Sequence, residues 1–344
     1  MAQLRRRTLK DIGDALGLSV NTVSRALSGK DSVSEETRAL VRAEADRIGY
    51  VPNLQARSLV LGSVMTLGLV ITNPSNPFYA QLISAIEMRG RAAGYSLLLV
   101  VSDESEENEA TALESLLRSA VDGAIVVPVQ GGSSPWGRLE RAGIPAVLDN
   151  RDLPGGGLDF VGTDNQRGAA EATRHLIARG ARSVMMLEED LPITTITERI
   201  SGYTEAMRGA GLAVPDGSVI PIPTRRYEKM ALPWQADEAY RVAQRLLDAG
   251  DRPDAFLVGN DYYALGLYRA LTERHLTVPD DVLIVGYGDY PFANFLAPPL
   301  STVRLPAAEV GGAAVDLLLE RIGRSTAPPV KKFVAPELVV RASA

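Results

Sequence analysis

Three side chains near the N-terminus have the types and the spacing needed to read DNA. Val20, Asn21 and Arg25 would share one side of a short helix over residues 20–27, because positions four apart lie on the same helix face. An arginine can donate two hydrogen bonds to a guanine, and an asparagine can pair with an adenine or a phosphate. The pattern predicts a helix whose N-terminal half meets base edges in the major groove.

The residues before this helix predict what positions it. Thr8 and Asp11 match a helix capping box, and an apolar helical pattern follows up to Leu16. Gly17 can adopt the left-handed turn that ends a helix, and Ser19 can cap the next one. Two short helices joined by a tight glycine turn are typical of a helix-turn-helix. From the helical pattern alone, a plain three-helix bundle with solvated polar positions remains an alternative.

A third helix is expected from a Ser34 cap to Ile48, with Leu40, Val41, Ala45 and Ile48 facing inward. The first sixty residues hold ten Lys/Arg and seven Asp/Glu, a net charge of +3. The remaining residues hold 26 basic and 35 acidic side chains, a net charge of -9. A basic head on an acidic body favours binding of a polyanion by the head.

Composition argues against several kinds of chemistry. Cysteine is absent, so the chain has no disulfide, no thiolate metal site and no cysteine nucleophile. Histidine occurs only at positions 175 and 275, which supplies a catalytic triad or a metal cluster poorly. We therefore predict no catalytic residues, no metal site and no cofactor. Because the chain shows neither a secretory signal nor an apolar run of the roughly 20 residues that span a bilayer, we expect a cytoplasmic protein without a membrane partner.

From about Gly62 onward, apolar runs alternate with helical patterns. Such alternation is typical of parallel sheets flanked by helices, in which ligands bind beyond the carboxyl ends of the strands. No Gly-x-x-x-x-Gly-Lys phosphate loop is present, and Gly286-Tyr287-Gly288 is too short for a dinucleotide fingerprint. The expected strands are Met65–Ile71, Ser96–Val101, Gly123–Val127, Ala146–Leu148, Ser183–Leu187, Ala255–Val258 and Val282–Val285. The expected helices include Phe78–Arg91, Asn108–Arg118, Gln166–Ala178, Glu198–Ala210, Trp234–Ala249 and Tyr262–Arg274.

Motifs along nearly the whole chain resemble those of the lactose/galactose-repressor (LacI/GalR) family of transcriptional regulators. In the first sixty residues they are Thr22-Val23-Ser24-Arg25, Val33-Ser34, Thr37-Arg38, Gly49-Tyr50-Val51-Pro52-Asn53 and Ala56-Arg57-Ser58-Leu59. In the body they include Asn73-Pro74-Ser75-Asn76-Pro77-Phe78, Asp122-Gly123, Gly259-Asn260-Asp261 and Val285-Gly286-Tyr287. Their order and spacing are those of the family, which disfavours the plain-bundle interpretation of the head.

The resemblance implies an α/β protein with three parts. Residues 1–52 would form a helix-turn-helix three-helix DNA-binding head, and residues 53–62 a hinge helix and linker. Residues 63–344 would form an effector-binding and dimerisation body like the periplasmic binding proteins, with two lobes of parallel αβα sheets and three strand crossings. Lobe one would comprise residues 63–162 plus 305–331, and lobe two residues 163–304 plus 332–341.

The resemblance also implies which residues bind DNA. In the family, the segment matching Asn53–Leu59 becomes a short helix on the operator, and Leu59 of each subunit would wedge between bases in the minor groove. Intercalated leucines cost unstacking energy but gain protein contact from the bent DNA. The alternative for Leu59 is an ordinary linker leucine. The implied DNA-binding residues are Thr8, Ser19, Val20, Asn21, Thr22, Ser24, Arg25, Asn53, Ala56 and Leu59.

Family ligand positions map onto a cleft between the lobes. The ring of Trp234 could stack on a sugar, and Arg199 offers a planar fork to vicinal hydroxyls or a carboxylate. As structural alternatives, Trp234 packs at a helix start, Asn260 only caps a helix, and Arg199 forms a surface ion pair with Glu198 or Glu205. The implied effector-binding residues are Thr72, Asn76, Phe78, Tyr79, Asn150, Arg199, Trp234, Asn260, Gly288 and Leu305.

Three of these positions depart from the family pattern. Asn150 stands where an acidic residue is frequent, Gly288 where Asp is frequent, and Leu305 where Gln is frequent. Because two acidic groups are missing while Arg199 is kept, the pocket is expected to tolerate an anionic ligand such as a sugar acid or sugar phosphate. The run from Glu188 to Asp190 is interpreted as a solvated acidic loop rather than a cation site.

These inferences predict a homodimeric transcriptional repressor that reads a pseudo-palindromic operator in double-stranded DNA. A sugar, sugar acid or sugar phosphate would change the lobe angle and so order or release the hinge. Alternatives are the same regulator with a nucleobase-type effector, or a solute-binding protein or sugar-acting enzyme without a regulatory role. A dimer is expected because no leucine-heptad tail, as in the family's tetramers, follows the last predicted strand.

Overall fold

A computed structural model divides the chain into two units, Met1–Val64 and Met65–Ala344. The structure describes residues 7–29, 32–50, 63–132, 134–153, 155, 157–223, 234–250, 252–323 and 327–344. The predicted hinge at residues 53–62, with Asn53, Ala56 and Leu59, therefore lies outside the described residues.

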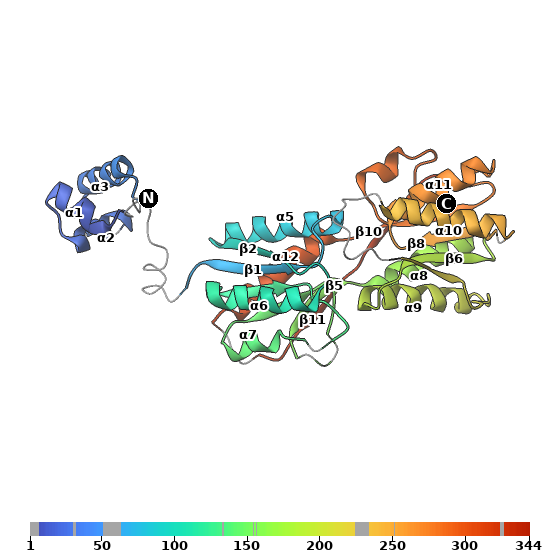
Figure 1. Cartoon of the computed structure of the whole chain (residues 1–344), viewed down its shortest axis with the longest axis horizontal. Helices are drawn as coiled ribbons and strands as arrows, with labels where there is room; N and C mark the ends of the chain where they lie inside the picture. Colours follow the sequence, from blue (N-terminus) through green and yellow to red (C-terminus); the bar gives the residue numbers. More distant parts are fainter. Residues whose placement is uncertain are drawn as a thin grey trace. The chain divides into compact units, whose positions relative to one another are not determined.

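The described residues of the first unit form the helices α1 (Leu9–Leu16), α2 (Val20–Leu27) and α3 (Glu35–Ile48) (Figure 1). The predicted capping box is confirmed, because the Thr8 side chain accepts from the backbone N–H of Asp11 and the Asp11 carboxylate accepts from that of Thr8. Gly17 ends α1 with a φ of +66°, and the Ser19 hydroxyl caps α2 by accepting from the backbone N–H of Thr22 at 3.1 Å. Local polar chemistry thus sets both ends of the turn between α1 and α2.

The core of this unit is small and apolar. Ile12, Val23, Ala26 and Val41, drawn from all three helices, have no exposed surface. Leu40 was expected to face inward but is 53% exposed. The inward face of α3 instead runs through residues 41, 45 and 48, because these positions repeat at helical spacing while residue 40 lies beside them.

The second unit contains two six-stranded sheets with the orders β11-β5-β4-β3-β1-β2 and β12-β10-β9-β8-β6-β7. Among the described strands every neighbouring pair is parallel except β10 with β12. The first sheet consists of β1 (Thr66–Ile71), β2 (Ser96–Val101), β3 (Gly123–Val126), β4 (Ala146–Asp149), β5 (Asp159–Thr163) and β11 (Lys331–Val334). The second consists of β6 (Val184–Glu189), β7 (Val219–Ile222), β8 (Ala255–Val258), β9 (Leu283–Gly288), β10 (Ser301–Arg304) and β12 (Glu337–Val339).

Helices cover both faces of each sheet, so each lobe is an αβα layer (Figure 1). Lobe one, built on the first sheet, has α5 (Pro77–Ala92) and α12 (Ala307–Arg321) on one face and α6 (Glu106–Ser119) and α7 (Gly137–Arg141) on the other. Lobe two has α10 (Trp234–Asp248) and α11 (Asp261–Glu273) on one face and α8 (Asn165–Ala178) and α9 (Thr194–Gly209) on the other. A 3₁₀ helix, η1 (Pro291–Phe295), follows β9. The predicted fold class is confirmed.

The chain passes between the lobes three times, after β5, after β10 and after β11. The third passage falls later than the boundary expected between residues 331 and 332. All four residues of β11 pair in register with β5, from Lys331 opposite Phe160 to Val334 opposite Thr163. β11 therefore belongs to lobe one, and the chain enters lobe two after Val334.

Five strands, β5, β7, β10, β11 and β12, were absent from the expected set. They are short, and three of them, β7, β11 and β12, lie at sheet edges. β7 contains Pro221 and β11 contains Lys331 and Lys332, residues that favour edge positions and break an apolar run. Within the described residues, no helix is long and apolar enough to cross a membrane.

Helices α8 and α9 approach so closely that a glycine is required between them. A Cβ atom on Gly202 of α9 would lie 2.0 Å from the carbonyl oxygen of Gln166 in α8. That oxygen is backbone, so neither helix could yield locally. The close contact holds one face of lobe two together, including the start of α9.

We predict that Gly202→Ala destabilises the protein by about 1–3 kcal/mol, the usual cost of overpacking, in denaturant unfolding. Gly209→Ala is the matched control in the same helix, because a Cβ there would meet nothing within 4 Å. It should be neutral or stabilising by up to about 1 kcal/mol. Equal effects of the two substitutions would show that the helix contact is not tight.

Candidate functional site

Helix α2 presents a polar face outward and an apolar face inward. Val20 is 46% exposed, and Asn21 and Arg25 are exposed, whereas Val23 and Ala26 are completely buried against α1 and α3. The three outward side chains occupy the spacing that base contacts need, and the buried pair fixes the helix on the rest of the head. The structure therefore brings together the residues predicted to read bases.

Of the remaining predicted DNA contacts in the head, Thr8, Ser19 and Thr22 lie at helix N-termini. Thr8 caps α1 and Ser19 caps α2, and the Ser19 and Thr22 hydroxyls are 2.8 Å apart. Exposed helix N-termini offer backbone N–H groups and the positive end of the helix dipole, which suits phosphate oxygens. Ser24 is half-buried, and its carbonyl oxygen accepts from the hydroxyl of Ser28.

In the second unit, most predicted effector positions stand where strands end. Thr72 follows β1, Asn150 follows β4, Gly288 ends β9 and Leu305 follows β10. Asn260 lies two residues beyond β8 and caps α11 by accepting from the backbone N–H of Tyr262 at 3.0 Å. Asn260 therefore caps a helix, as its structural alternative proposed. It also lies at the edge where the strands end, so the two interpretations are compatible. The carboxyl ends of parallel strands are where ligands of such sheets bind.

The lobe-one side chains of this set touch one another. The Thr72 hydroxyl donates to the Tyr79 hydroxyl at 3.3 Å, and the rings of Phe78 and Tyr79 meet edge to face at 5.5 Å. Burial raises the pKa of Tyr79, which a hydrogen bond from Asn150 partly opposes. Four predicted positions therefore form one cluster at the edge of the first sheet.

A buried carboxyl group that the sequence interpretation did not select directly precedes Asn150 in the chain. Asp149 is the last residue of β4, is fully buried, and has no hydrogen-bond partner for either oxygen in the described part of the chain. Burial raises its pKa well above the usual value. An unsatisfied buried carboxyl is costly unless a partner is supplied, and ligand hydroxyls could supply one.

Arg199 is held inside lobe two. Its Nη1 atom donates to the carbonyl oxygen of Gly259 at 2.9 Å and lies 3.4 Å from the Glu188 carboxylate. Its guanidinium sits 4.4 Å from the centre of the Tyr287 ring. Only 14% of the Arg199 side chain and 4% of the Glu188 side chain are exposed. The positive charge is therefore already matched by a buried carboxylate.

Two sequence interpretations are corrected by this pair. The surface ion pair that was the structural alternative for Arg199 is not formed with Glu198 or Glu205; Glu198 accepts from Asn165 and Glu205 from Gln166. The run from Glu188 to Asp190 is not a wholly solvated loop, since Glu188 is buried. Because Glu188 pairs with Arg199, the positive charge of Arg199 is already matched, and the charge argument for an anionic ligand loses its support.

Tyr290, which the sequence interpretation did not select, connects several selected residues. Its hydroxyl donates to Asn76 Oδ1 in lobe one at 3.1 Å, and Asn260 is among the groups that influence its pKa. A Cβ on Gly288 would lie 2.9 Å from its ring. An aromatic residue two positions after a strand-ending glycine is the signal that could have marked it.

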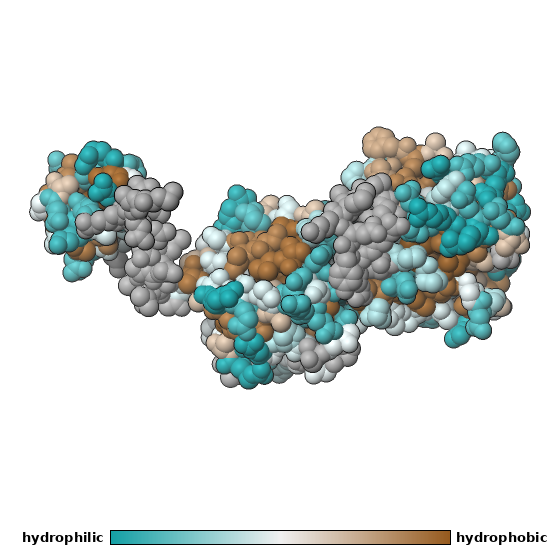
Figure 2. Space-filling model, in the orientation of Figure 1, coloured by the Kyte–Doolittle hydropathy of each residue, from teal (hydrophilic) through white to brown (hydrophobic). Residues whose placement is uncertain are grey.

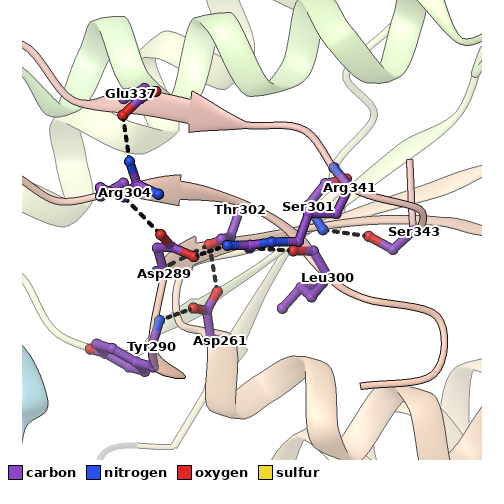
Figure 3. A network of polar contacts seen from close by, with 10 residues as sticks. All are labelled: Asp261, Asp289, Tyr290, Leu300, Ser301, Thr302, Arg304, Glu337, Arg341 and Ser343. Atoms are coloured by element: carbon purple, nitrogen blue, oxygen red, sulfur yellow. Dashed lines mark hydrogen bonds and ion pairs between the residues drawn. The ribbon is translucent and has the colours of Figure 1, made fainter. Parts of the chain in front are cut away.

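A polar network fixes the turn that carries Tyr290 (Figure 3). The buried carboxylate of Asp261 accepts from the Thr302 hydroxyl at 2.7 Å and from the backbone N–H of Tyr290 at 2.9 Å. Burial raises the pKa of Asp261 to about 6. Asp289 accepts from Arg304 and Arg341, and these bonds tie the turn to β10 and the C-terminal residues.

A second contact joins the lobes, since Gln130 Oε1 accepts from the backbone N–H of Thr194 at 2.8 Å. Leu305 is half-buried and packs against apolar residues of both lobes. Trp234 begins α10, but its side chain is outside the described residues. In the described part of the chain, no three His, Asp or Glu side chains are grouped as metal ligands would be.

Comparisons with known proteins cover the full length of the chain. Residues 8–53 match the model of bacterial regulatory proteins of the lacI family, and residues 173–344 match a periplasmic binding protein-like domain. The chain is 32% identical to the ribose operon repressor of Escherichia coli strain K12, covering 98% of this chain and 99% of that protein.

Two solved structures are also similar to this chain over 98% of its length. A lac repressor dimer bound to operator and the anti-inducer ONPF matches with a TM-score of 0.85 at 26% identity, over 98% of this chain and 99% of that one. A complex of the transcriptional regulator CelR with cellobiose matches with a TM-score of 0.72 at 28% identity, over 98% and 100% of the two chains.

Proposed function

Since this chain belongs to the lacI family of bacterial regulatory proteins, we propose that it represses transcription and that a small carbohydrate controls its binding to an operator. The observation that carries the proposal is the exposed face of α2, set on a buried apolar pair, in a chain similar to known repressors along its whole length. Its action on DNA implies a cytoplasmic protein, and its family implies that it is not an enzyme.

Each subunit would place Val20, Asn21 and Arg25 in a major groove, with Thr8, Ser19, Thr22 and Ser24 beside them. A two-fold dimer requires two symmetric half-sites, so the operator would be a pseudo-palindrome. By resemblance to the family, Asn53, Ala56 and Leu59 would form the hinge contacts in the minor groove. Lobe movement on effector binding would order or release that hinge.

The effector would be a neutral sugar. Arg199 is neutralised by Glu188, so its guanidinium offers no unmatched positive charge to an anionic ligand. The hydroxyls of a sugar provide donors and acceptors that match Asn76, Asn150 and Asn260. The similar proteins named above include a ribose operon repressor and a regulator complexed with cellobiose, which supports the carbohydrate class.

The homodimer would form through β2 and the adjoining part of α5. Leu99 and Val101 on this edge strand are 41% and 38% exposed, and Met88 on α5 is 62% exposed. Figure 2 shows an apolar area on lobe one in this region. The opposite edge strand, β11, carries Lys331 and Lys332, and charged residues of this kind prevent edge pairing. β2 has no such protection, which supports β2 as the interface.

Replacing Arg25 with alanine should weaken binding to the operator by about 1–3 kcal/mol, because a bidentate base contact is lost. Binding to random DNA of equal length should change much less. Arg42→Ala is the control, since it removes the same charge from an exposed position on α3. The measurement is fluorescence anisotropy at fixed salt. Equal losses on both DNAs for Arg25→Ala would mean that Arg25 contacts only phosphates.

Titration of the full-length protein with neutral pentoses, hexoses and disaccharides should show saturable binding. The corresponding aldonates and sugar phosphates should bind at least tenfold more weakly, because Glu188 already balances Arg199. Calorimetry gives the affinities, and operator release or tightening in the presence of the same sugar gives the regulatory effect. Tight binding of only the anionic forms would contradict the charge assignment, and binding of nucleobases alone would replace the carbohydrate by the other candidate effector.

Leu99→Lys should convert the dimer to a monomer at micromolar concentration, because it places a charge in the apolar edge. Phe333→Lys, at a 53% exposed position on the opposite edge strand β11, should remain dimeric. Sedimentation velocity distinguishes the two states. A dimer that survives Leu99→Lys but is lost in Phe333→Lys would place the interface on β11 instead.

A further inference from the structure

Tyr290 lies between the two lobes and is almost completely buried, with 4% of its surface exposed. It comes from the turn after β9 in lobe two, and its hydroxyl donates to Asn76 Oδ1 at the start of α5 in lobe one. Its ring packs against Tyr262 at 5.5 Å. A single side chain therefore reaches from a fixed turn in one lobe to a helix end in the other.

The acceptor that Tyr290 uses is fully occupied. A carboxamide oxygen has two lone pairs. Asn76 Oδ1 accepts a hydrogen bond from the backbone N–H of Phe78 at 3.0 Å, which is the N-cap bond of α5. It accepts a second one from the Tyr290 hydroxyl at 3.1 Å. A ligand hydroxyl that donates to this oxygen must displace one of the two. The N–H of Phe78 is part of the helix, so the Tyr290 hydroxyl is the partner that can leave.

The position of Tyr290 is imposed from its own lobe. Asp261 holds its backbone N–H at 2.9 Å, and Figure 3 shows its ring directed away from that carboxylate. Gly288 has a φ of +135° and leaves the space that the ring takes, since a Cβ there would lie 2.9 Å from ring atoms. The backbone, the ring and the hydroxyl of Tyr290 are each constrained by a separate contact. The hydroxyl is therefore positioned to bond Asn76 before any ligand binds.

We propose that Tyr290 is a latch and a specificity-determining residue: its hydroxyl bonds Asn76 across the lobes, and an effector hydroxyl competes for the same oxygen. Breaking the bond frees lobe two from the first turn of α5, so effector binding and release of the lobe contact become one event. The competition rests on the proposed function, because it takes Asn76 as an effector contact, but the latch itself does not.

The test compares Tyr290→Phe with Tyr262→Phe in the full-length protein. The first substitution removes only the latch hydroxyl and leaves the ring that fills the space over Gly288. The second removes a hydroxyl from the adjoining ring and keeps the latch. Hydrogen–deuterium exchange of residues 77–82 reports the first turn of α5 without any ligand. Exchange there should be about 2- to 10-fold faster in Tyr290→Phe, the effect of one hydrogen bond, and unchanged in Tyr262→Phe.

Gly288→Ala gives the same test without touching Tyr290, since the added Cβ would push the ring from its place. It should accelerate exchange in the same segment. Wild-type exchange rates in both Tyr290→Phe and Gly288→Ala would overturn the latch.

A panel of neutral monosaccharides then tests the competition. The tightest-binding sugar should bind Tyr290→Phe about 2- to 10-fold more tightly than wild type, because it no longer displaces a hydroxyl. Weaker binding would overturn the competition and would mean that Tyr290 contacts the sugar directly. If no sugar binds any variant, the carbohydrate part of the proposed function fails, while the exchange data still decide the latch.

Discussion

The buried pair of Arg199 and Glu188 sets the electrostatics on which the effector site depends. A guanidinium taken out of water is tolerated only when opposite charge and hydrogen-bond acceptors surround it, and here Glu188, the carbonyl of Gly259 and the ring of Tyr287 do so. The pair lies in lobe two, where α9 meets the carboxyl-terminal ends of β6 and β9. Because its charges cancel, the pair supports the proposal of a polar, uncharged effector.

The two units divide the work by separate physical means. The head is a small apolar core that holds the outward face of α2 by burial of Val23 and Ala26, and its helix ends are set by local caps. The body instead depends on long-range packing between sheets and helices, including the glycine contact of α8 with α9. Base reading therefore needs only local order, whereas ligand binding needs residues that come from both ends of the body sequence.

Coupling between the lobes runs through few polar contacts. Among the described residues, Gln130 bonds Thr194 and Tyr290 bonds Asn76, so a change in the lobe angle would break or exchange these hydrogen bonds. The network around Asp261 makes the lobe-two side of one contact rigid. A contact that is weak in energy but fixed in position is suited to control by a small ligand.

The amino-acid sequence by itself determined the head, because caps, glycine turns and helical periodicity act over a few residues: Thr8, Gly17 and Ser19 do what their local pattern predicts. It also determined the alternation of buried strands and helices, since continuous apolar runs mark central strands. Only the tertiary structure decided the partners of charged groups. Glu188 rather than Glu198 faces Arg199, Asp149 rather than Asn150 carries the buried acid, and Tyr290 reaches Asn76 across 214 positions of sequence. Such pairings form because strands that are far apart in the chain end at a shared edge of a sheet. The periodicity of the sequence does not indicate which strand ends lie together.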